Sequence, residues 1–94
     1  MIRSFKDKDT EAIFNGRYVR RIPKALSALA ARKLNQLHAS GSLDDLRIPP
    51  GNRLEALKGD RKGQYSIRVN DQWRVCLIWK VSGPESVEIV DDHS

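Results

Sequence analysis

Residues 64–81 read QYSIRVNDQWRVCLIWKV, in which apolar and polar side chains alternate on both sides of a short polar segment. Alternation with a period of two predicts β-strands, and residues 70–72 predict the turn between them. A three-residue loop keeps the apolar side chains of both strands on one face, whereas a two-residue loop would separate them. The predicted cross-strand pairs are Val69–Trp73, Ile67–Val75 and Tyr65–Leu77.

The second face of this predicted hairpin is basic. The same register sets Arg68 directly opposite Arg74, and Ser66 and Cys76 lie beside them on that face. Like charges in this position destabilise a sheet. Their presence indicates either an anionic ligand or long side chains that extend into water.

Two further strands are expected beside the hairpin, at residues 54–58 and 87–90, with turns at 59–63 and 82–86. The apolar pattern predicts Leu57 opposite Tyr65, which adds Lys58 to the basic face. For the last hairpin it predicts Val81–Val87, Trp79–Ile89 and Lys80–Glu88. Asp92 then lies opposite Cys76, so the acidic end of the chain and His93 reach the basic face. Alternatively, Asp91 and Asp92 are ordinary salt-bridge partners.

The first half of the chain predicts a short strand at 1–5 and two helices. Asp7 caps a helix over 7–15 that Gly16 ends, and a second helix runs from Pro23 to the stop at Gly41. Residues 42–46 predict one more helical turn before the break at 48–52. Helices followed by antiparallel strands predict one α+β domain over residues 1–94, with two N-terminal helices packed on one face of a small antiparallel β-sheet. Apolar residues recur every three or four positions in the second helix, at Leu26, Leu29, Ala30, Leu34 and Leu37.

The polar side of the second helix carries Lys24, Arg32, Lys33 and Gln36, and it is interpreted as a solvated face. His38, near the end of this helix, is interpreted as a surface residue that interacts with the helix dipole.

The charge of the chain is unevenly distributed. All 17 Lys and Arg and eight of the 12 acids lie in residues 1–84, a net +9, whereas the last ten residues carry −4. A basic body is typical of proteins that bind phosphate backbones, although it also serves solubility. The chain shows no signal peptide and no apolar run that would cross a membrane, so we expect a cytoplasmic location.

Cysteine and histidine are too few for a conventional metal site. Cys76 is the only cysteine, and His38 and His93 are the only histidines. No disulfide is therefore expected within the chain, and catalysis would use side chains alone, without a metal or cofactor.

Several segments resemble HigB-type toxins of the RelE superfamily, and the resemblance covers nearly the whole chain. It implies a ribosome-dependent messenger RNA endonuclease, paired with a HigA-like antitoxin that binds operator DNA and represses the shared operon. Contact with DNA would then be only indirect, through the antitoxin. The matching segments are residues 1–5, 52–63, 66–70, 72–74 and 87–93.

The resemblance also implies the site residues. The catalytic set is Lys58, Arg74, Asp91 and His93, and the predicted RNA contacts are Arg53, Arg61, Lys62, Arg68 and Asp92. The family usually has tyrosine at the position of Asp92, so this chain lacks the aromatic ring that would stack on the substrate base. Some members carry histidine where this chain has Glu55.

Metal-free RNA cleavage requires a base, an acid and cations for the charge that develops on phosphorus. In this hypothesis, Arg74 and Lys58 stabilise that charge, while Asp91 and His93 share the proton transfers. Two alternatives remain open, a gyrase-binding toxin with the same fold and a non-toxic RNA-binding domain. Without the resemblance, a histidine beside the chain end is more often part of a frayed tail.

Overall fold

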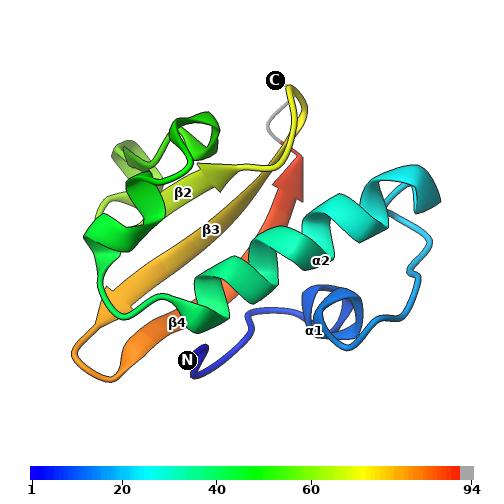
Figure 1. The fold of residues 1–94 in the computed structure, drawn as a ribbon, viewed down its shortest axis with the longest axis horizontal. Coiled ribbons are helices and arrows are strands. Elements are labelled where there is room, and N and C mark those ends of the chain that lie inside the picture. Colours follow the sequence, from blue (N-terminus) through cyan, green and yellow to red (C-terminus); the bar gives the residue numbers. More distant parts are fainter. Residues whose placement is uncertain (92–94) are drawn as a thin grey trace.

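Two helices cover one face of a four-stranded antiparallel sheet in the computed structural model, which describes residues 1–91 (Figure 1). The strands are ordered β1-β2-β3-β4 across the sheet. This arrangement confirms the predicted α+β class. The helices and strands are α1 (Lys8–Phe14), α2 (Lys24–Ala39), β1 (Glu55–Ala56), β2 (Tyr65–Arg68), β3 (Trp73–Lys80) and β4 (Gly83–Asp91), with 3-10 turns η1 (Leu43–Arg47), η2 (Pro50–Asn52) and η3 (Gly59–Arg61).

Both helices begin and end close to the predicted positions. The Asp7 carboxylate accepts a hydrogen bond from the Thr10 backbone N–H at 3.3 Å and caps α1, and Gly16 follows the helix with φ of 84°. Pro23 occupies the cap position of α2 rather than the first helical position. The predicted turn after α2 is present as η1, where Ser42 and Asp45 form a capping box.

The core lies between α2 and the inner face of the sheet. Leu34 and Leu37 of α2 are fully buried, as are Ile67, Val75 and Leu77 of the central strands. These are the side chains that the helical and strand periodicities assigned to the core. Burial of apolar surface on this one face holds the two layers together.

The register of the central hairpin agrees with the prediction. Tyr65 pairs with Leu77, Ile67 with Val75, and Arg68 with Arg74. The second face therefore collects Ser66, Arg68, Arg74 and Cys76 as predicted. The apolar pattern was sufficient here because only one register buries all of the large side chains.

The predicted register of the last hairpin is wrong. The turn consists of Val81 and Ser82 alone, and Trp79 pairs with Pro84 rather than with Ile89. A bulge near Ser86, whose φ is 52°, then returns Val87 and Ile89 to the core face. Consequently Lys80 pairs with Gly83, not Glu88, and Glu88 takes the position opposite Cys76 that was assigned to Asp92.

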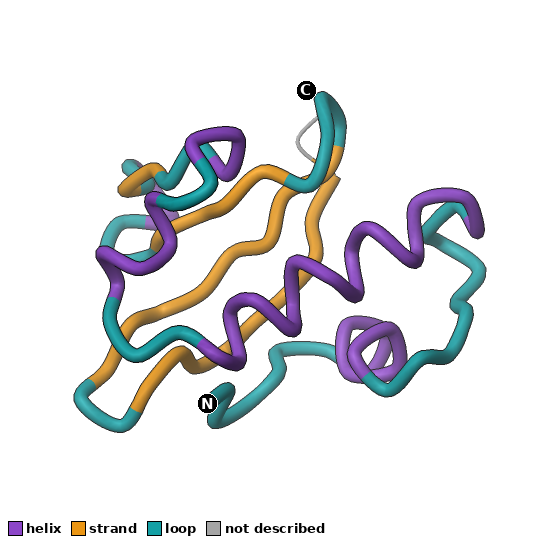
Figure 2. Tube along the Cα trace, viewed as in Figure 1, coloured by secondary structure: helices purple, strands orange, loops and turns teal. Residues whose placement is uncertain are grey.

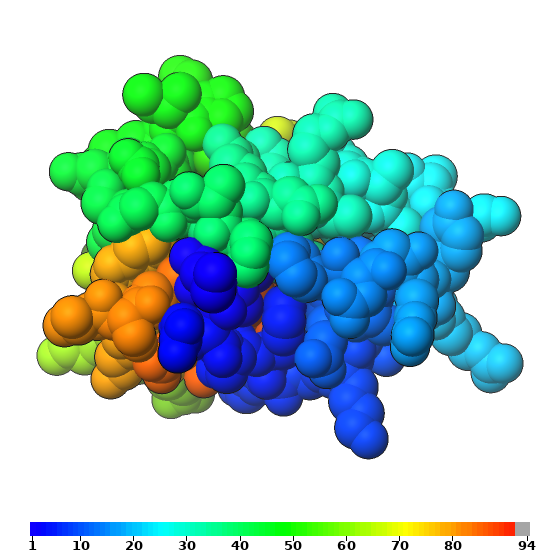
Figure 3. All heavy atoms as spheres, turned by 60° about the horizontal axis from the view of Figure 1, so that its bottom comes forward, coloured from blue at the N-terminus to red at the C-terminus, as the bar shows by residue number. Residues whose placement is uncertain are grey.

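The N-terminal segment explains why β4 extends through residues that read as a turn. Backbone hydrogen bonds from Arg3 N–H to Pro84 O (2.8 Å) and from Lys6 N–H to Val87 O (2.9 Å) join this segment to the outer edge of β4. Figure 3 shows residues at the N-terminus, in dark blue, against the orange hairpin. A β-carbon on Gly83 would lie 2.6 Å from the Met1 carbonyl oxygen, so this close approach requires glycine. The predicted strand at 1–5 is wrong, because only an isolated bridge between Phe5 and Val87 forms there.

The first strand of the sheet is shorter than predicted. β1 contains two residues, and Ala56 rather than Leu57 pairs with Tyr65. Lys58 follows the end of this strand and precedes η3. The register that assigned Lys58 to the basic face is therefore wrong, because the chain turns before it reaches that position.

Candidate functional site

Arg74 lies at the centre of the basic face and is held in one orientation. Its Nε donates to Ser66 Oγ at 2.7 Å, and its Nη2 donates to the Arg53 carbonyl oxygen at 2.9 Å and the Ser66 carbonyl oxygen at 3.4 Å. The side chain is 13% exposed and borders an open hollow lined by Arg53, Leu54, Glu55 and Arg74. Within residues 1–91, Nη1 makes no hydrogen bond.

A buried asparagine holds the loop that supplies the Arg53 carbonyl. Asn52 is fully buried, and its side-chain amide donates to Leu46 O at 3.1 Å and accepts from Lys33 Nζ at 2.6 Å. Arg53 follows with φ of 46°, a conformation that directs the chain over the sheet. Sequence reasoning missed Asn52, and the Pro-Pro-Gly-Asn break was the one indication that this segment has a fixed shape.

The side of α2 that was predicted to be a solvated face therefore also holds the neighbouring loop in place. Lys33 binds Asn52, and Gln36 donates to Ile48 O at 2.8 Å. Burial lowers the pKa of Lys33, and the neighbouring charges of Arg32 and Arg68 lower it further. Lys33 thus lies in the electrostatic neighbourhood of the basic face.

The opposed arginines each have an internal carboxylate nearby. Arg68 pairs with Asp71 in the following turn, and Arg74 Nη2 lies 3.7 Å from Glu55 Oε1. The hydrogen bond from Arg68, together with its charge, holds the pKa of Asp71 below its usual value. Because both carboxylates are largely exposed, at 99% and 62%, they compensate the arginines without closing the face to an anion.

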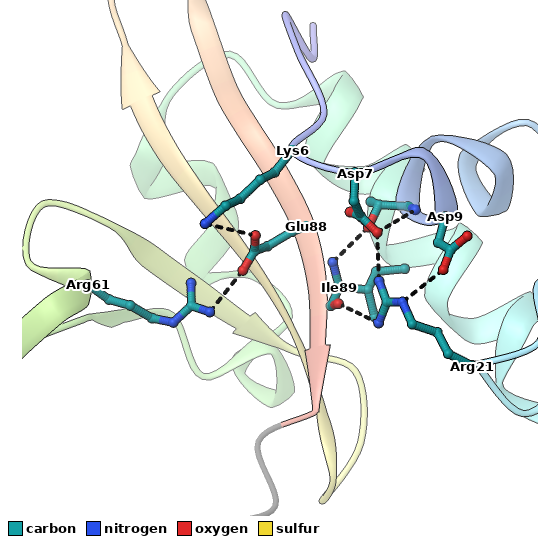
Figure 4. A network of polar contacts seen from close by, with 8 residues as sticks. Lys6, Asp7, Asp9, Arg21, Arg61, Glu88 and Ile89 are labelled. Atoms are coloured by element: carbon teal, nitrogen blue, oxygen red, sulfur yellow. Dashed lines mark hydrogen bonds and ion pairs between the residues drawn. The ribbon is translucent and has the colours of Figure 1, made fainter.

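Arg61 lies on this side of the sheet but points to a carboxylate instead of the solvent. Its Nη2 lies 2.9 Å from Glu88 Oε1, and Lys6 Nζ lies 3.4 Å from Glu88 Oε2 (Figure 4). The hydrogen bond to Glu88 raises the pKa of Arg61. The Glu88 side chain is only 11% exposed, so Arg61 and Lys6 compensate a nearly buried charge.

The end of β4 reaches the neighbourhood of Arg74. Val90 is the register partner of Arg74, and Asp91 is the partner of Trp73. The Asp91 carboxylate accepts from Gln72 Nε2 at 3.1 Å, in the turn that Figure 2 shows beside the end of β4. By register, Asp91 belongs to the core face with Trp73 and Arg74 belongs to the basic face, so adjacent positions of the sheet present these two side chains to opposite faces. Asp92 and His93, predicted as site residues, lie outside the described residues.

The outer edge of β4 is anchored two residues before Asp91. Thr10 Oγ1 accepts from the Ile89 backbone N–H at 2.9 Å, and Arg21 Nη1 donates to the Ile89 carbonyl oxygen at 3.0 Å (Figure 4). Arg21 also binds the carboxylates of Asp7 and Asp9, at 2.8 and 3.1 Å. Sequence reasoning missed this cluster, because its contacts with β4 span 68 and 79 residues.

The structure thus gathers some predicted site residues and separates others. Arg53 and Arg74 line the hollow together, and Arg68 is the cross-strand partner of Arg74. Lys58 and Lys62 are exposed at the two ends of η3, and within residues 1–91 no hydrogen bond joins either of them to Arg74.

His38 connects the end of α2 to the N-terminal segment. Its Nδ1 accepts from the Ile2 backbone N–H at 3.1 Å, and its ring lies 5.2 Å from that of Phe14. Among the described residues, no group of three or more His, Cys, Asp or Glu side chains is arranged to hold a metal ion. The helices of residues 1–91 also include none with the length and apolar character needed to span a membrane.

Comparison with known proteins identifies the family. Toxin HigB-1 of Vibrio cholerae serotype O1 is 43% identical over 94 residues, which cover 99% of this chain and 98% of that protein. An uncharacterized protein of Haemophilus influenzae is 44% identical over 75 residues, 79% of this chain and 72% of that protein. Residues 3–93 match the family described as the RelE-like toxin of type II toxin-antitoxin system HigB. The chain therefore belongs to the HigB-like toxins of the RelE family, and a toxin of this type has a cognate antitoxin as its partner.

Proposed function

We propose that this toxin is an endoribonuclease that cleaves messenger RNA on the ribosome by metal-free acid and base chemistry. The observation that carries the proposal is the fixed guanidinium of Arg74 at the open hollow. A donor that is already oriented stabilises developing charge without reorganising during the reaction. Neutral groups at 2.7 and 2.9 Å orient this guanidinium, and its carboxylate partner Glu55 is 62% exposed at 3.7 Å, so in the proposal a phosphate displaces Glu55.

The cations around Arg74 provide a path for the RNA backbone. Arg53 is exposed beside the hollow, Arg68 is the cross-strand neighbour, and Lys62 is exposed after η3. In the proposal these side chains bind phosphates and set the register of the message. The assignment of Arg61 to RNA binding requires it to leave Glu88, and the role of Lys58 requires its flexible side chain to reach the hollow.

The proton transfers are assigned to Asp91 and His93. One would take the proton of the ribose 2′-hydroxyl, which attacks phosphorus, and the other would protonate the departing 5′ oxygen. The bond to the 5′ oxygen breaks as the 2′ oxygen bonds to phosphorus, so the products are a 2′,3′-cyclic phosphate and a 5′-hydroxyl. Imidazole suits either role near neutral pH.

The ribosome is proposed to complete the site. Because the chain offers few proton-transfer groups, we expect it to cleave free RNA slowly. A message held in the decoding region of the ribosome is already oriented, and orientation can lower an activation barrier by several kcal/mol (about 7–11 at most). The antitoxin is proposed to be HigA-like and to contact operator DNA, so that the toxin meets DNA only through it.

The test is to incubate the purified toxin with the same message, translated or naked, and to map the ends produced. We expect cleavage of the translated message, little cleavage of naked RNA, and a cyclic phosphate at the 3′ end in the presence of EDTA. Metal-dependent products with a 5′-phosphate, or equal cleavage of both substrates, would contradict the proposal.

The change His93→Ala separates this proposal from a toxin that acts only by binding, such as a gyrase inhibitor. Loss of growth arrest is expected if the imidazole transfers a proton, because removing such a group costs roughly 10²–10⁴-fold in rate. Intact growth arrest with His93→Ala would favour the binding-only function.

A further inference from the structure

A shallow groove lies between the end of α1 and the first half of α2, in the helix layer. Its volume is about 100 Å³. Alanine and serine on α2 form one wall, so a partner backbone can approach closely, and Ile13 forms part of the apolar floor. The lining residues are Ile13, Gly16, Arg17, Tyr18, Ser27, Ala28 and Ala31.

A tyrosine stands at the rim of this groove. Tyr18 is 65% exposed, and Lys24 Nζ lies 5.0 Å from the centre of its ring. The cation holds the ring in place at an exposed site. Tyrosine and arginine are among the residue types that contribute most to protein–protein binding.

The groove is bordered by positive charge, because Arg17 lines it and Lys24 lies against Tyr18 at its rim. Residues 12–43 contain no Asp or Glu but six Lys and Arg. Arg21 pairs with Asp7 and Asp9, whereas within residues 1–91 the other five form no ion pair. Those five are Arg17, Arg20, Lys24, Arg32 and Lys33, of which Lys33 binds Asn52 and is not part of the groove.

We propose that this groove is a docking surface for an acidic, amphipathic helix of the antitoxin. The apolar floor and small-residue wall fit the apolar face of a helix, and the cations Arg17 and Lys24 fit its acidic side. RNA would use the cations but not the apolar lining, so the observations favour a protein partner. The inference rests on the family of the chain and does not depend on RNA cleavage.

The groove and the proposed nuclease site lie on different faces of the molecule, so each can be tested independently. The groove belongs to the helices that cover the inner face of the sheet (Figure 1), and by register Arg74 belongs to the opposite face. A substitution in the groove is therefore expected to leave the basic face unchanged.

The experiment measures binding of the purified toxin to its cognate antitoxin by calorimetry. Ala28→Arg, which fills the groove from an exposed position, is expected to weaken binding at least 10-fold, and Tyr18→Ala to weaken it by a similar factor. Lys24→Glu is expected to weaken binding more at low salt than at high salt. The matched control is Val81→Arg, a fully exposed residue in the turn between β3 and β4, which should bind like the native toxin.

Two outcomes would overturn the proposal. One is antitoxin binding within twofold of native for both Ala28→Arg and Tyr18→Ala. The other is that these variants lose binding to 70S ribosomes while antitoxin binding is retained, which would make the surface an RNA contact. If Ala28→Arg does not fold, as judged by circular dichroism, the result with Tyr18→Ala decides, because that side chain is 65% exposed.

Discussion

Arg74 and Arg21 are both held by several hydrogen bonds, but their partners differ in charge. Arg21 binds two carboxylates, at 2.8 and 3.1 Å, and the Ile89 carbonyl oxygen. Arg74 binds a hydroxyl and two carbonyl oxygens, and its nearest paired carboxylate is 3.7 Å away. The difference teaches that a guanidinium can be held in one orientation without being closely neutralised. The cluster around Arg21 joins helices to a strand, whereas Arg74 is oriented by neutral groups and has only a longer contact with a carboxylate, as the proposed role in binding phosphate requires.

The largest expected effect comes from Arg74→Ala. Cleavage of ribosome-bound message should fall about 10²–10³-fold, the loss typical of removing an oriented donor to developing charge. Stability should fall only by about 1–3 kcal/mol, because the buried Ser66 hydroxyl loses its partner. Single-turnover cleavage measured under conditions where the variant is folded separates the two effects.

Ser66→Ala is the matched control for this variant, since it removes the 2.7 Å hydrogen bond but leaves the cation in place. It should retain more activity than Arg74→Ala. Equal losses in the two variants would mean that the site depends on the packing of this face and not on the guanidinium.

A smaller effect, on stability, is expected from Arg21→Ala. Two carboxylates and the Ile89 carbonyl lose a donor, and the partly exposed positions of these groups limit the cost to about 1–3 kcal/mol. Chemical denaturation would measure it, with Arg20→Ala as the control, because Arg20 forms no ion pair within residues 1–91. The folded variant should keep far more cleavage activity than Arg74→Ala, and unchanged stability would show that the cluster is not a structural anchor.

The contrast also separates what the sequence could predict from what it could not. The inner face was predictable, because alternation in residues 64–81 allows only one register that buries Ile67, Val75 and Leu77. The start of β4 was not predictable, because glycine and proline, here Gly83 and Pro84, are residue types typical of turns. They belong to a strand only because the N-terminal segment binds its outer edge.

The candidate site shows the same limit. The Arg68–Arg74 pair followed from local register, and the structure retains it. The anchors of that site were not predictable, because they depend on contacts between distant segments, such as Lys33 with Asn52 and Arg21 with Ile89. Arg61 was grouped with the RNA contacts on charge alone, and only the fold reveals its pairing with Glu88.

Glu88→Gln tests whether Arg61 is a structural ion-pair residue, like Arg21, or can bind a phosphate, as proposed for Arg74. The substitution keeps the side-chain shape and removes the charge that Arg61 and Lys6 share. Both cations are partly exposed and can turn to water, so the expected loss of stability is about 1 kcal/mol. If Arg61 then becomes available to phosphates, affinity for ribosome-bound RNA should increase and depend more steeply on salt. Glu85→Gln on the same strand is the control, and a fall in RNA affinity would contradict this account.

The smallest expected effect is a change in pH dependence from Asp7→Asn. Burial raises the pKa of the Asp7 carboxyl, but the hydrogen bonds from Thr10 and Arg21 and the charge of Arg21 outweigh it, so the pKa lies below its usual value. A carboxyl with a lowered folded-state pKa stabilises the fold above its unfolded pKa, about 3.9, and loses that contribution as pH falls through the folded value.

In the Asp7→Asn variant, asparagine keeps the cap of α1 but lacks the charge. The difference in melting temperature between native and Asp7→Asn toxin should therefore be present at pH 6 and shrink below about pH 4. Glu11→Gln, a change at an exposed carboxylate of the same helix, is the control. A difference between native and Asp7→Asn that stays constant from pH 6 to pH 3 would show that the charge of Asp7 does not contribute to the anchoring of the helices on β4 by Arg21, which would then depend on Asp9 and the Ile89 carbonyl.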